Sequence, residues 1–355
     1  HKVMGGLNDA YLYADNPKAM SIVVKFCDWT EETLRGLNDE RIQLMLACEH
    51  GGMNEMLVNV YAITGNKKYL DLSYKFHHKA ILDSLAKRKD ILPGKHSNTQ
   101  IPKIIGSARR YELTGAEPDK TTADFFWNTM VNNHTYAMGG NSDSEHLGQP
   151  GKLNDRISDN TAETCNTYNM LKLTRHLFCW QPSGANADYY ERALYNHILG
   201  SQNPADGMMC YFRPLRRGGR KDYSDKFNSF WCCVGSGIEN HVKYGESIYY
   251  KGAEGSLFVN LFVPSELNWR EKGMIVKQET VFPKSNSTTL TISCKKPVKL
   301  AIQIRNPWWS KDQAKFELNG KEVMAKKSDN GYWVIDRTWR NGDQFKVSFV
   351  LSAYS

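Results

Sequence analysis

A helical pattern that recurs every 50 residues is the strongest constraint on the fold of this chain. Tyr11, Tyr61 and Tyr111 each fall near the end of a helical stretch, and each is followed by a polar or glycine-containing turn and a second helical stretch. Gly65 and Gly115 stand where a helix commonly ends in a left-handed residue. Helical hairpins at a fixed period predict a stack or ring of paired helices.

Further amphipathic stretches continue this pattern to Tyr250. In "AETCNTYNMLKLTRHLF", the apolar residues Met170, Leu173 and Leu177 share one helical face. "ADYYERALYNHILG" and "GIENHVKYGESIYY" show the same periodicity. The sequence therefore predicts about nine helical segments before residue 250.

After residue 253 the pattern changes to short runs rich in β-branched residues, such as "SLFVNLFVP", "KLAIQIR" and "QFKVSFVL". Leu290 and Ile292 alternate with polar residues, as expected of a half-buried strand. Asn319-Gly320 is a strong signal for a type I′ hairpin. We predict a helical domain over residues 1–253 and an antiparallel β domain, a sandwich, over residues 254–355.

Composition excludes several classes of protein. The net charge of +8 is spread along the chain, and its densest runs, "LAKRKD" and "RPLRRGGRK", are more typical of solvated loops than of a nucleic-acid surface. No stretch approaches the roughly 18 apolar residues that a membrane span needs. The eight cysteines lack the density and spacing of a disulfide scaffold. We therefore expect neither a nucleic-acid partner nor a membrane partner.

Two adjacent cysteines, Cys232 and Cys233 in "FWCCVG", require a separate explanation. Consecutive Cα atoms lie about 3.8 Å apart, which is below the roughly 4.4 to 6.8 Å of disulfides. The pair is either two small buried residues or, together with Glu163 and Cys165 of "AETC", a tetrahedral zinc set. Residues two apart point to opposite sides of a helix. Glu163 and Cys165 therefore need a helix start or a loop to converge, and "DNT" just before them supplies capping residues for a helix start.

The remaining cysteines and a histidine pair do not indicate a functional site. We expect the following cysteines to be small buried residues: Cys27, Cys48, Cys179, Cys210 and Cys294. The pair His77-His78 is predicted to be solvated surface.

Several motifs together resemble glycoside hydrolase family 127, the β-L-arabinofuranosidase family. The motifs are "HKVMGGLNDAY", "CEHGGMNEML", "HSNTQIPKIIGSARRYELTG", "GGNSDSEHLG", "AETCNTYNMLKLTRHLF", "FWCCVGSGIENHVKYGESIYY" and "IRNPWW". The resemblance implies an (α/α)6 barrel followed by a β-sandwich. The chain begins inside the "HK" motif, and about nine helices are about three short of a complete ring. We therefore expect the N-terminal helices of the barrel to be missing.

The resemblance also implies roles for individual residues. It assigns a zinc ion to four ligands: Glu163, Cys165, Cys232 and Cys233. Cys232 would be the nucleophile and Glu145, in "GGNSDSEH", the general acid/base. Three further residues would contact the sugar: His1, His96 and Tyr211.

From this resemblance we expect a zinc-dependent retaining exo-glycosidase that releases β-L-arabinofuranose or a similar sugar from plant-derived glycans. Its partner would be an oligosaccharide or glycoside, and we also expect a homodimer formed through the β domain. One alternative is a relative that cleaves another uncommon sugar of pectin. Another is a non-catalytic helical toroid that binds sugar and carries a structural zinc. The compartment is open, and we expect a periplasmic or cytoplasmic bacterial enzyme.

Overall fold

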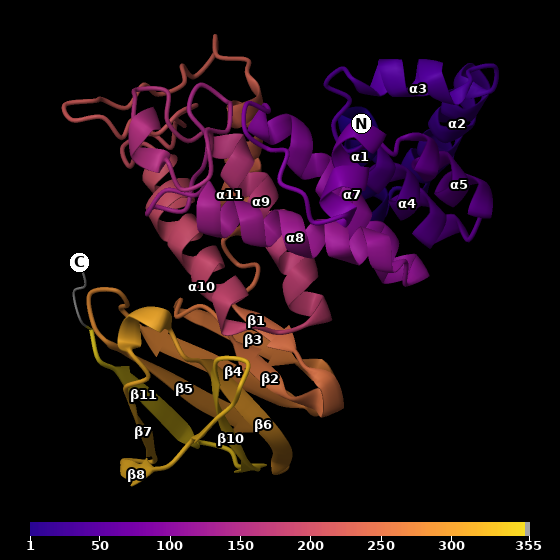
Figure 1. The fold of residues 1–355 in the computed structure, drawn as a ribbon. Coiled ribbons are helices and arrows are strands. Elements are labelled where there is room, and N and C mark those ends of the chain that lie inside the picture. The colour runs from indigo at the N-terminus through magenta and orange to yellow at the C-terminus, as the bar shows by residue number, and fades with distance from the viewer. Residues whose placement is uncertain (352–355) are drawn as a thin grey trace. The chain divides into compact units, whose positions relative to one another are not determined.

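The computed structural model describes residues 1–351, and by their contacts these form two compact units (Figure 1). The first unit comprises His1–Cys179 and Arg192–Asn240. The second comprises Trp180–Glu191 and the chain from His241 onward. The domain limits at residues 253 and 254 stay a prediction.

Eleven α-helices lie in the described part of the chain, two more than the sequence predicted. They are α1 (Lys2–Tyr13), α2 (Pro17–Leu34), α3 (Asp39–Leu46), α4 (Met53–Thr64), α5 (Lys67–Lys75), α6 (Lys79–Ala86), α7 (Ser97–Thr114), α8 (Glu117–Asn133), α9 (Thr164–Trp180), α10 (Gly184–Ala193) and α11 (Cys232–Lys243). Short 3-10 or π turns lie at η1 (Leu153–Arg156), η2 (Leu194–Ile198), η3 (Leu199–Ser201), η4 (Ala253–Gly255), η5 (Arg270–Lys272) and η6 (Trp308–Ser310). No helix among the described residues is long and apolar enough to cross a membrane.

The 50-residue repeat is confirmed as three helical hairpins, α1–α2, α4–α5 and α7–α8. Gly65 and Gly115 end α4 and α7 with φ of 68° and 70°. Each donates its backbone N–H to the carbonyl of the repeat tyrosine, Tyr61 or Tyr111, at 2.8 Å. Glycine adopts this left-handed conformation without the Cβ penalty, so the chain can turn directly into the next helix.

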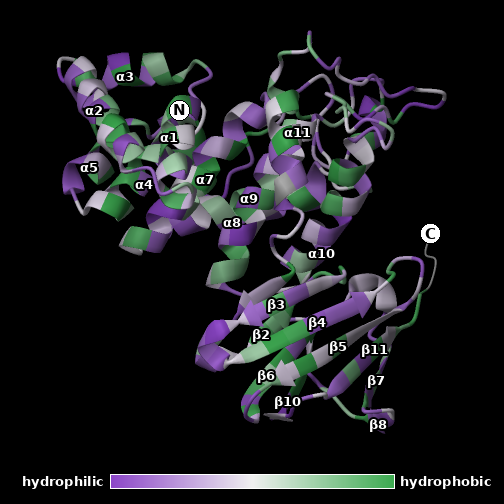
Figure 2. Cartoon of the chain, turned by 180° about the vertical axis from the view of Figure 1, so that it is seen from behind, coloured by the Kyte–Doolittle hydropathy of each residue, from purple (hydrophilic) through white to green (hydrophobic). Residues whose placement is uncertain are grey.

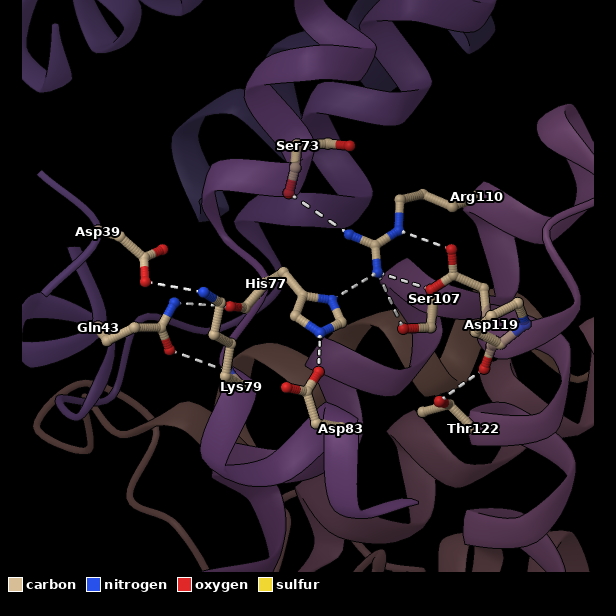
Figure 3. A network of polar contacts seen from close by, with 11 residues as sticks. Asp39, Gln43, Ser73, His77, Lys79, Asp83, Ser107, Arg110, Asp119 and Thr122 are labelled. Carbon is tan, nitrogen blue, oxygen red and sulfur yellow. Dashed lines mark hydrogen bonds and ion pairs between the residues drawn. The ribbon is translucent and has the colours of Figure 1, made fainter. Parts of the chain in front are cut away.

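A buried polar network around Arg110 ties four helices of the first unit together (Figure 3). The Arg110 side chain of α7 is fully buried and forms a two-pronged ion pair with Asp119 of α8. It also contacts the Ser73 carbonyl of α5 and the ring of His77, whose other nitrogen lies 2.7 Å from Asp83 of α6. A buried guanidinium needs such partners, because an unpaired charge in the interior is costly.

The structure corrects two predictions about which residues are exposed and which are buried. His77 is a partly buried member of the network and His78 is buried, so the pair is not solvated surface. Cys48 and Cys179 are exposed rather than buried, whereas the expectation of burial holds for Cys27 and Cys210. Cys294 is intermediate.

The second unit contains two β-sheets. Their strands are β1 (Tyr249–Lys251), β2 (Leu257–Val259), β3 (Ser265–Trp269), β4 (Met274–Thr280), β5 (Ser287–Cys294), β6 (Val298–Arg305), β7 (Ala314–Leu318), β8 (Lys321–Val323), β9 (Lys326–Lys327), β10 (Tyr332–Trp339) and β11 (Gln344–Phe349). One sheet has the order β1-β2-β6-β10-β9 and the other β3-β4-β5-β11-β7-β8. Neighbouring strands are antiparallel except for β2 and β6, which are parallel.

The two sheets share one apolar core, as expected of a sandwich. Ile302 of β6 and Ile292 of β5 come from different sheets, and both are fully buried in that core. Hydrophilic and hydrophobic segments both occur along the strands in Figure 2, in keeping with the alternating burial of β5. Asn319 and Gly320, with φ of 52° and 77°, form the predicted hairpin between β7 and β8.

The segment Trp180–Glu191 is held to the sandwich by a buried arginine. Arg305 of β6 forms ion pairs with Asp188 and Glu191, and its own side chain has no exposed surface. The indole nitrogen of Trp309 donates to Glu191 at 3.0 Å. Trp309 is therefore a packing residue of the second unit.

Candidate active site

The start of helix α9 presents Glu163 and Cys165 to the same side. Glu163 directly precedes the helix and forms an isolated β-bridge with Phe212, while Cys165 lies in the first turn. The hydroxyl of Thr164 donates to the Cys210 carbonyl at 2.9 Å and fixes the junction between them. The predicted helix start is present, and it allows two residues with a spacing of two to converge.

The start of helix α11 supplies the adjacent cysteines, because Cys232 and Cys233 are its first two residues. Cys233 is fully buried, whereas Cys232 is exposed. The unpaired N–H groups of a helix N-terminus favour negative charge, which stabilises a thiolate there. Within this first turn, Cys233 thus lies in the interior of the protein and Cys232 is open to solvent.

The four side chains converge as one cluster, with a ligand atom of each within 4.8 Å of the others. The Sγ atoms of Cys165 and Cys233 are 3.3 Å apart, and those of Cys232 and Cys233 are 3.9 Å apart. Glu163 Oε1 lies 3.7 Å from Cys232 Sγ and 3.9 Å from Cys233 Sγ. Tetrahedral zinc with Zn–S distances of about 2.3 Å spaces its sulfurs about 3.8 Å apart. The cluster therefore has the dimensions of a zinc site.

The electrostatics of the cluster also fit a cation. Burial raises the pKa of Glu163 to about 9, and its Oε2 is buried with no hydrogen-bond partner among the described residues. A carboxylate in this position gains a partner when a metal ion binds. Three thiols and one carboxylate match the soft-to-borderline donors that zinc takes. The residues present fit the ion.

The three thiols differ in how readily they lose a proton. Hydrogen bonds from Cys165 and Cys233 lower the pKa of Cys232, and the hydroxyl of Tyr211 acts in the same direction. The pKa of Cys165 is raised, first through its hydrogen bond to Cys232, and burial raises that of Cys233. Negative charge therefore collects on Cys232, the solvent-exposed thiol.

Glu145 lies beside this cluster. Its Oε1 accepts a hydrogen bond from the hydroxyl of Tyr211, which is itself 3.6 Å from Cys232 Sγ. His96 Nε2 lies 3.4 Å from Glu145 Oε2. Because His96 Nδ1 accepts the N–H of Thr99, the ring proton is on Nε2 and points toward Glu145. The structure thus brings Glu145, His96, Tyr211 and Cys232 into one set of contacts.

His1 lies against the start of α4. Its Nδ1 accepts the backbone N–H of Gly52 at 3.2 Å. A Cβ at Gly51 would come within 2.5 Å of the ring, so the glycine is what allows the imidazole to approach the backbone. The His1 side chain is thus hydrogen-bonded to this turn.

Two residues of the site were missed by sequence reasoning. The ring of Trp231 lies 5.4 Å from that of Tyr211, between centroids, and adds an aromatic wall. Ser236 Oγ lies 3.1 Å from Cys165 Sγ. Trp231 directly precedes the cysteine pair and Ser236 follows Cys232 by one helical turn, so both could have been found from their spacing.

Comparison with known families gives matches along nearly the whole chain. The family model of the GH127 catalytic domain of β-L-arabinofuranosidases matches residues 1–246, and that of the GH127 middle domain matches residues 256–351. The non-reducing end β-L-arabinofuranosidase of Bifidobacterium longum subsp. longum is 22% identical over 266 residues. That alignment covers 69% of this chain and 39% of the Bifidobacterium protein.

Solved structures show the same fold. The crystal structure of a GH127 β-L-arabinofuranosidase from Geobacillus stearothermophilus T6 has a TM-score of 0.79 at 21% identity, and the match covers 98% of this chain and 61% of that one. A second GH127 β-arabinofuranosidase has a TM-score of 0.78 at 21% identity and covers 98% and 58%. This chain therefore spans less than two thirds of the length of these relatives. The predicted fold class, a helical toroid followed by a β domain, is confirmed.

Proposed function

Because the chain belongs to glycoside hydrolase family 127, the family of β-L-arabinofuranosidases, we propose that it hydrolyses β-L-arabinofuranosides or glycosides of a similar sugar. The single observation that supports this most strongly is the contact set of Tyr211. Its hydroxyl touches a carboxylate, Glu145, and the exposed thiol of the metal-type cluster, Cys232. A glycosidase needs two such groups beside one glycosidic bond.

Zinc is the proposed cofactor, held by Glu163, Cys165, Cys232 and Cys233. Bound there, it would keep the coordinating thiols deprotonated, since a thiol on zinc loses its proton outright. The buried Cys165 and Cys233 would anchor the ion. Cys232, which is exposed and has the lowered pKa, is the sulfur that a substrate can reach.

In the proposed reaction Cys232 Sγ attacks the anomeric carbon while the bond to the departing oxygen breaks. Glu145 donates a proton to that oxygen in the same step. Glu145 then removes a proton from water, whose oxygen attacks the anomeric carbon and displaces the Cys232 thiolate. Two inversions return the product with the configuration of the substrate.

The close approach of the two groups supports retention. Glu145 and Cys232 both contact one phenolic oxygen, whereas inverting enzymes separate their two carboxyl groups by about 6.5 to 9.5 Å to admit a water. His96 and Tyr211 would contact the sugar next to Glu145. His1 would do so from the start of α4.

Two alternatives make different predictions. A relative specific for another uncommon sugar of pectin would use the same residues on a different glycoside. A non-catalytic toroid with a structural zinc would bind sugar without turnover, and it would not need a carboxylate and an exposed thiol in contact with one hydroxyl. Dimer formation through the β domain stays a prediction.

The test is a panel of aryl glycofuranosides and glycopyranosides incubated with the zinc-loaded protein, with the anomeric configuration of each product followed by NMR. We expect turnover of the β-L-arabinofuranoside with retention. Turnover of a different sugar with retention would correct the proposed substrate but support the proposed mechanism. Binding without turnover across the panel would favour the non-catalytic toroid.

A further inference from the structure

Glu145 lies at the tip of a tight turn whose backbone conformation most residue types rarely adopt. Asp143 and His146 exchange two backbone hydrogen bonds, of 3.1 and 3.0 Å, and enclose Ser144 and Glu145. These two residues have φ of 46° and 67°. A two-residue hairpin with both φ values positive is a type I′ turn, which favours glycine, asparagine and aspartate. Serine and glutamate in those positions are strained, so the surroundings must hold the turn in place.

Arg156, at the end of η1, contacts the two residues that close this turn. Its Nη2 donates to the carbonyl of Asp143 at 3.0 Å and approaches that of His146 at 3.5 Å, the two residues that close the turn. The same nitrogen lies 3.8 Å from the carboxylate of Asp143. One guanidinium therefore spans both ends of the turn that carries Glu145.

Arg156 is itself fixed in place. Its carbonyl accepts the hydroxyl of Tyr136 at 2.7 Å. Its Cδ passes so close to Gly148 that a Cβ there would lie 2.4 Å away. The hydroxyl of Ser158 donates a hydrogen bond to the Asp143 carboxylate. Arg156 thus reaches the turn from a backbone that is hydrogen-bonded to Tyr136, with its side chain packed against Gly148.

From these contacts we propose that Arg156 is a positioning residue for the general acid/base, holding the Ser144–Glu145 turn in the conformation that points the carboxylate at the leaving group. The proposal rests on the acid/base role of Glu145 under the proposed function. Arg156 acts through the backbone of the turn, and among the described residues it makes no hydrogen bond to Glu163 or to the cysteines of the cluster. Its loss would therefore impair acid/base catalysis and leave the cysteine cluster intact.

The experiment compares Arg156→Ala, Arg156→Lys and Glu145→Gln, with Arg216→Ala as the matched control. Arg216 is an exposed arginine that pairs with Asp159 at 2.6 Å and makes no contact with the turn. For each variant kcat/KM is measured on a β-L-arabinofuranoside with a poor leaving group and on one with an activated aryl leaving group. Zinc content and thermal unfolding are recorded on the same samples.

We expect Arg156→Ala to lose about 10- to 10²-fold on the poor leaving group, the effect of misplacing a catalytic group by about 1 Å, and much less on the activated one. Arg156→Lys should recover part of the loss, because it keeps the cation but not the planar fork. Millimolar guanidinium should raise the rate of Arg156→Ala and not that of Glu145→Gln. Zinc content should equal that of the unchanged protein, and Arg216→Ala should show no leaving-group effect.

Two results would overturn the positioning role and leave the acid/base role standing. One is an equal loss on both substrates in Arg156→Ala. The other is unchanged kinetics in Arg156→Ala while Glu145→Gln shows the selective loss. If Arg156→Ala does not fold, the same comparison is made with Arg156→Lys. If Glu145→Gln lacks the selective loss, the acid/base role fails, and the positioning role falls with it.

Discussion

The hydroxyl oxygen of Tyr211 lies 3.6 Å from Cys232 Sγ and donates a hydrogen bond to Glu145 Oε1. One phenol thus joins the proposed nucleophile to the proposed acid/base. Burial raises the pKa of Tyr211, so the hydroxyl stays protonated and remains a donor. The contact between Tyr211 and Cys232 is also one cause of the lowered pKa of the Cys232 thiol.

Tyr211→Phe should lower kcat/KM by about 10- to 10²-fold, since a hydrogen bond to a charged group contributes about 1.5 to 3 kcal/mol. Bound zinc should not change, because Tyr211 is not one of the four ligands. The matched control is Tyr223→Phe, which removes the same atom in the same segment and should retain the activity of the unchanged protein. A Tyr211→Phe enzyme with unchanged kinetics would remove the hydroxyl from the mechanism.

Serine replacements should separate the two adjacent cysteines. Cys232→Ser should abolish turnover while Glu163, Cys165 and Cys233 still hold zinc, because a hydroxyl is a far weaker nucleophile than a thiolate. Cys233→Ser should mainly weaken zinc affinity, because it removes a buried anchor. Zinc per chain and turnover are measured on both variants. Equal loss of zinc in the two variants, with activity surviving in metal-free protein, would contradict this division of roles.

Removing Asp119 should destabilise the first unit strongly. Asp119→Ala leaves the guanidinium of Arg110 without its ion-pair partner, and the Arg110 side chain is fully buried. We expect a cost of about 3 to 5 kcal/mol in the free energy of unfolding, measured by denaturant titration. Asp39→Ala is the matched control, because it breaks the exposed pair with Lys79, and should cost less than about 1 kcal/mol. Similar losses in the two variants would show that the Arg110 network is not a buried charge cluster.

His197 should make folding sensitive to acid. Burial lowers its pKa to about 3, and its Nδ1 lies 2.5 Å from Thr167 Oγ1. The unfolded chain takes up the proton below about pH 6.5, whereas the folded chain does not. The free energy of unfolding should therefore fall with pH below about 6.5, with a contribution from His197 of up to about 1.4 kcal/mol per pH unit.

His197→Gln should remove that part of the slope in denaturant titrations at pH 7, 6 and 5. Thr167→Val is the control, because it removes the partner and keeps the titrating ring; it should be less stable at each pH but retain the slope. An unchanged slope in His197→Gln would mean that the acid sensitivity arises from other groups.

Short sequence patterns predicted the helical hairpins and the β-hairpin, because turns are determined by a few neighbouring residues. The repeat tyrosines with Gly65 and Gly115 located the helical hairpins, and Asn319-Gly320 located a β-hairpin. That Glu163 and Cys165 could converge followed from the sequence, because a helix start or a loop can bring residues two apart together. Their grouping with Cys232 and Cys233, which the structure shows, was implied by the family resemblance.

The remainder depends on contacts between distant segments. Arg156 reaches the Glu145 turn across more than ten residues of irregular chain, and no periodicity marks that contact. His77 and His78 are polar residues, yet His77 is partly buried beside Arg110 and His78 is buried beside Lys103. The attachment of Trp180–Glu191 to the sandwich depends on Arg305, which lies more than a hundred residues away in sequence.

The most direct measurement of the proposed mechanism is the mass of a trapped intermediate. Zinc-loaded Glu145→Gln is incubated with an activated aryl β-L-arabinofuranoside, quenched in acid and mapped by peptide mass spectrometry. With the acid/base removed, the second step is slowed more than the first, so a sugar should accumulate on the protein. We predict one glycosyl adduct, on the peptide and the sulfur of Cys232. An adduct on Glu163 or any other residue, or turnover with no adduct and inverted product, would contradict a cysteine nucleophile.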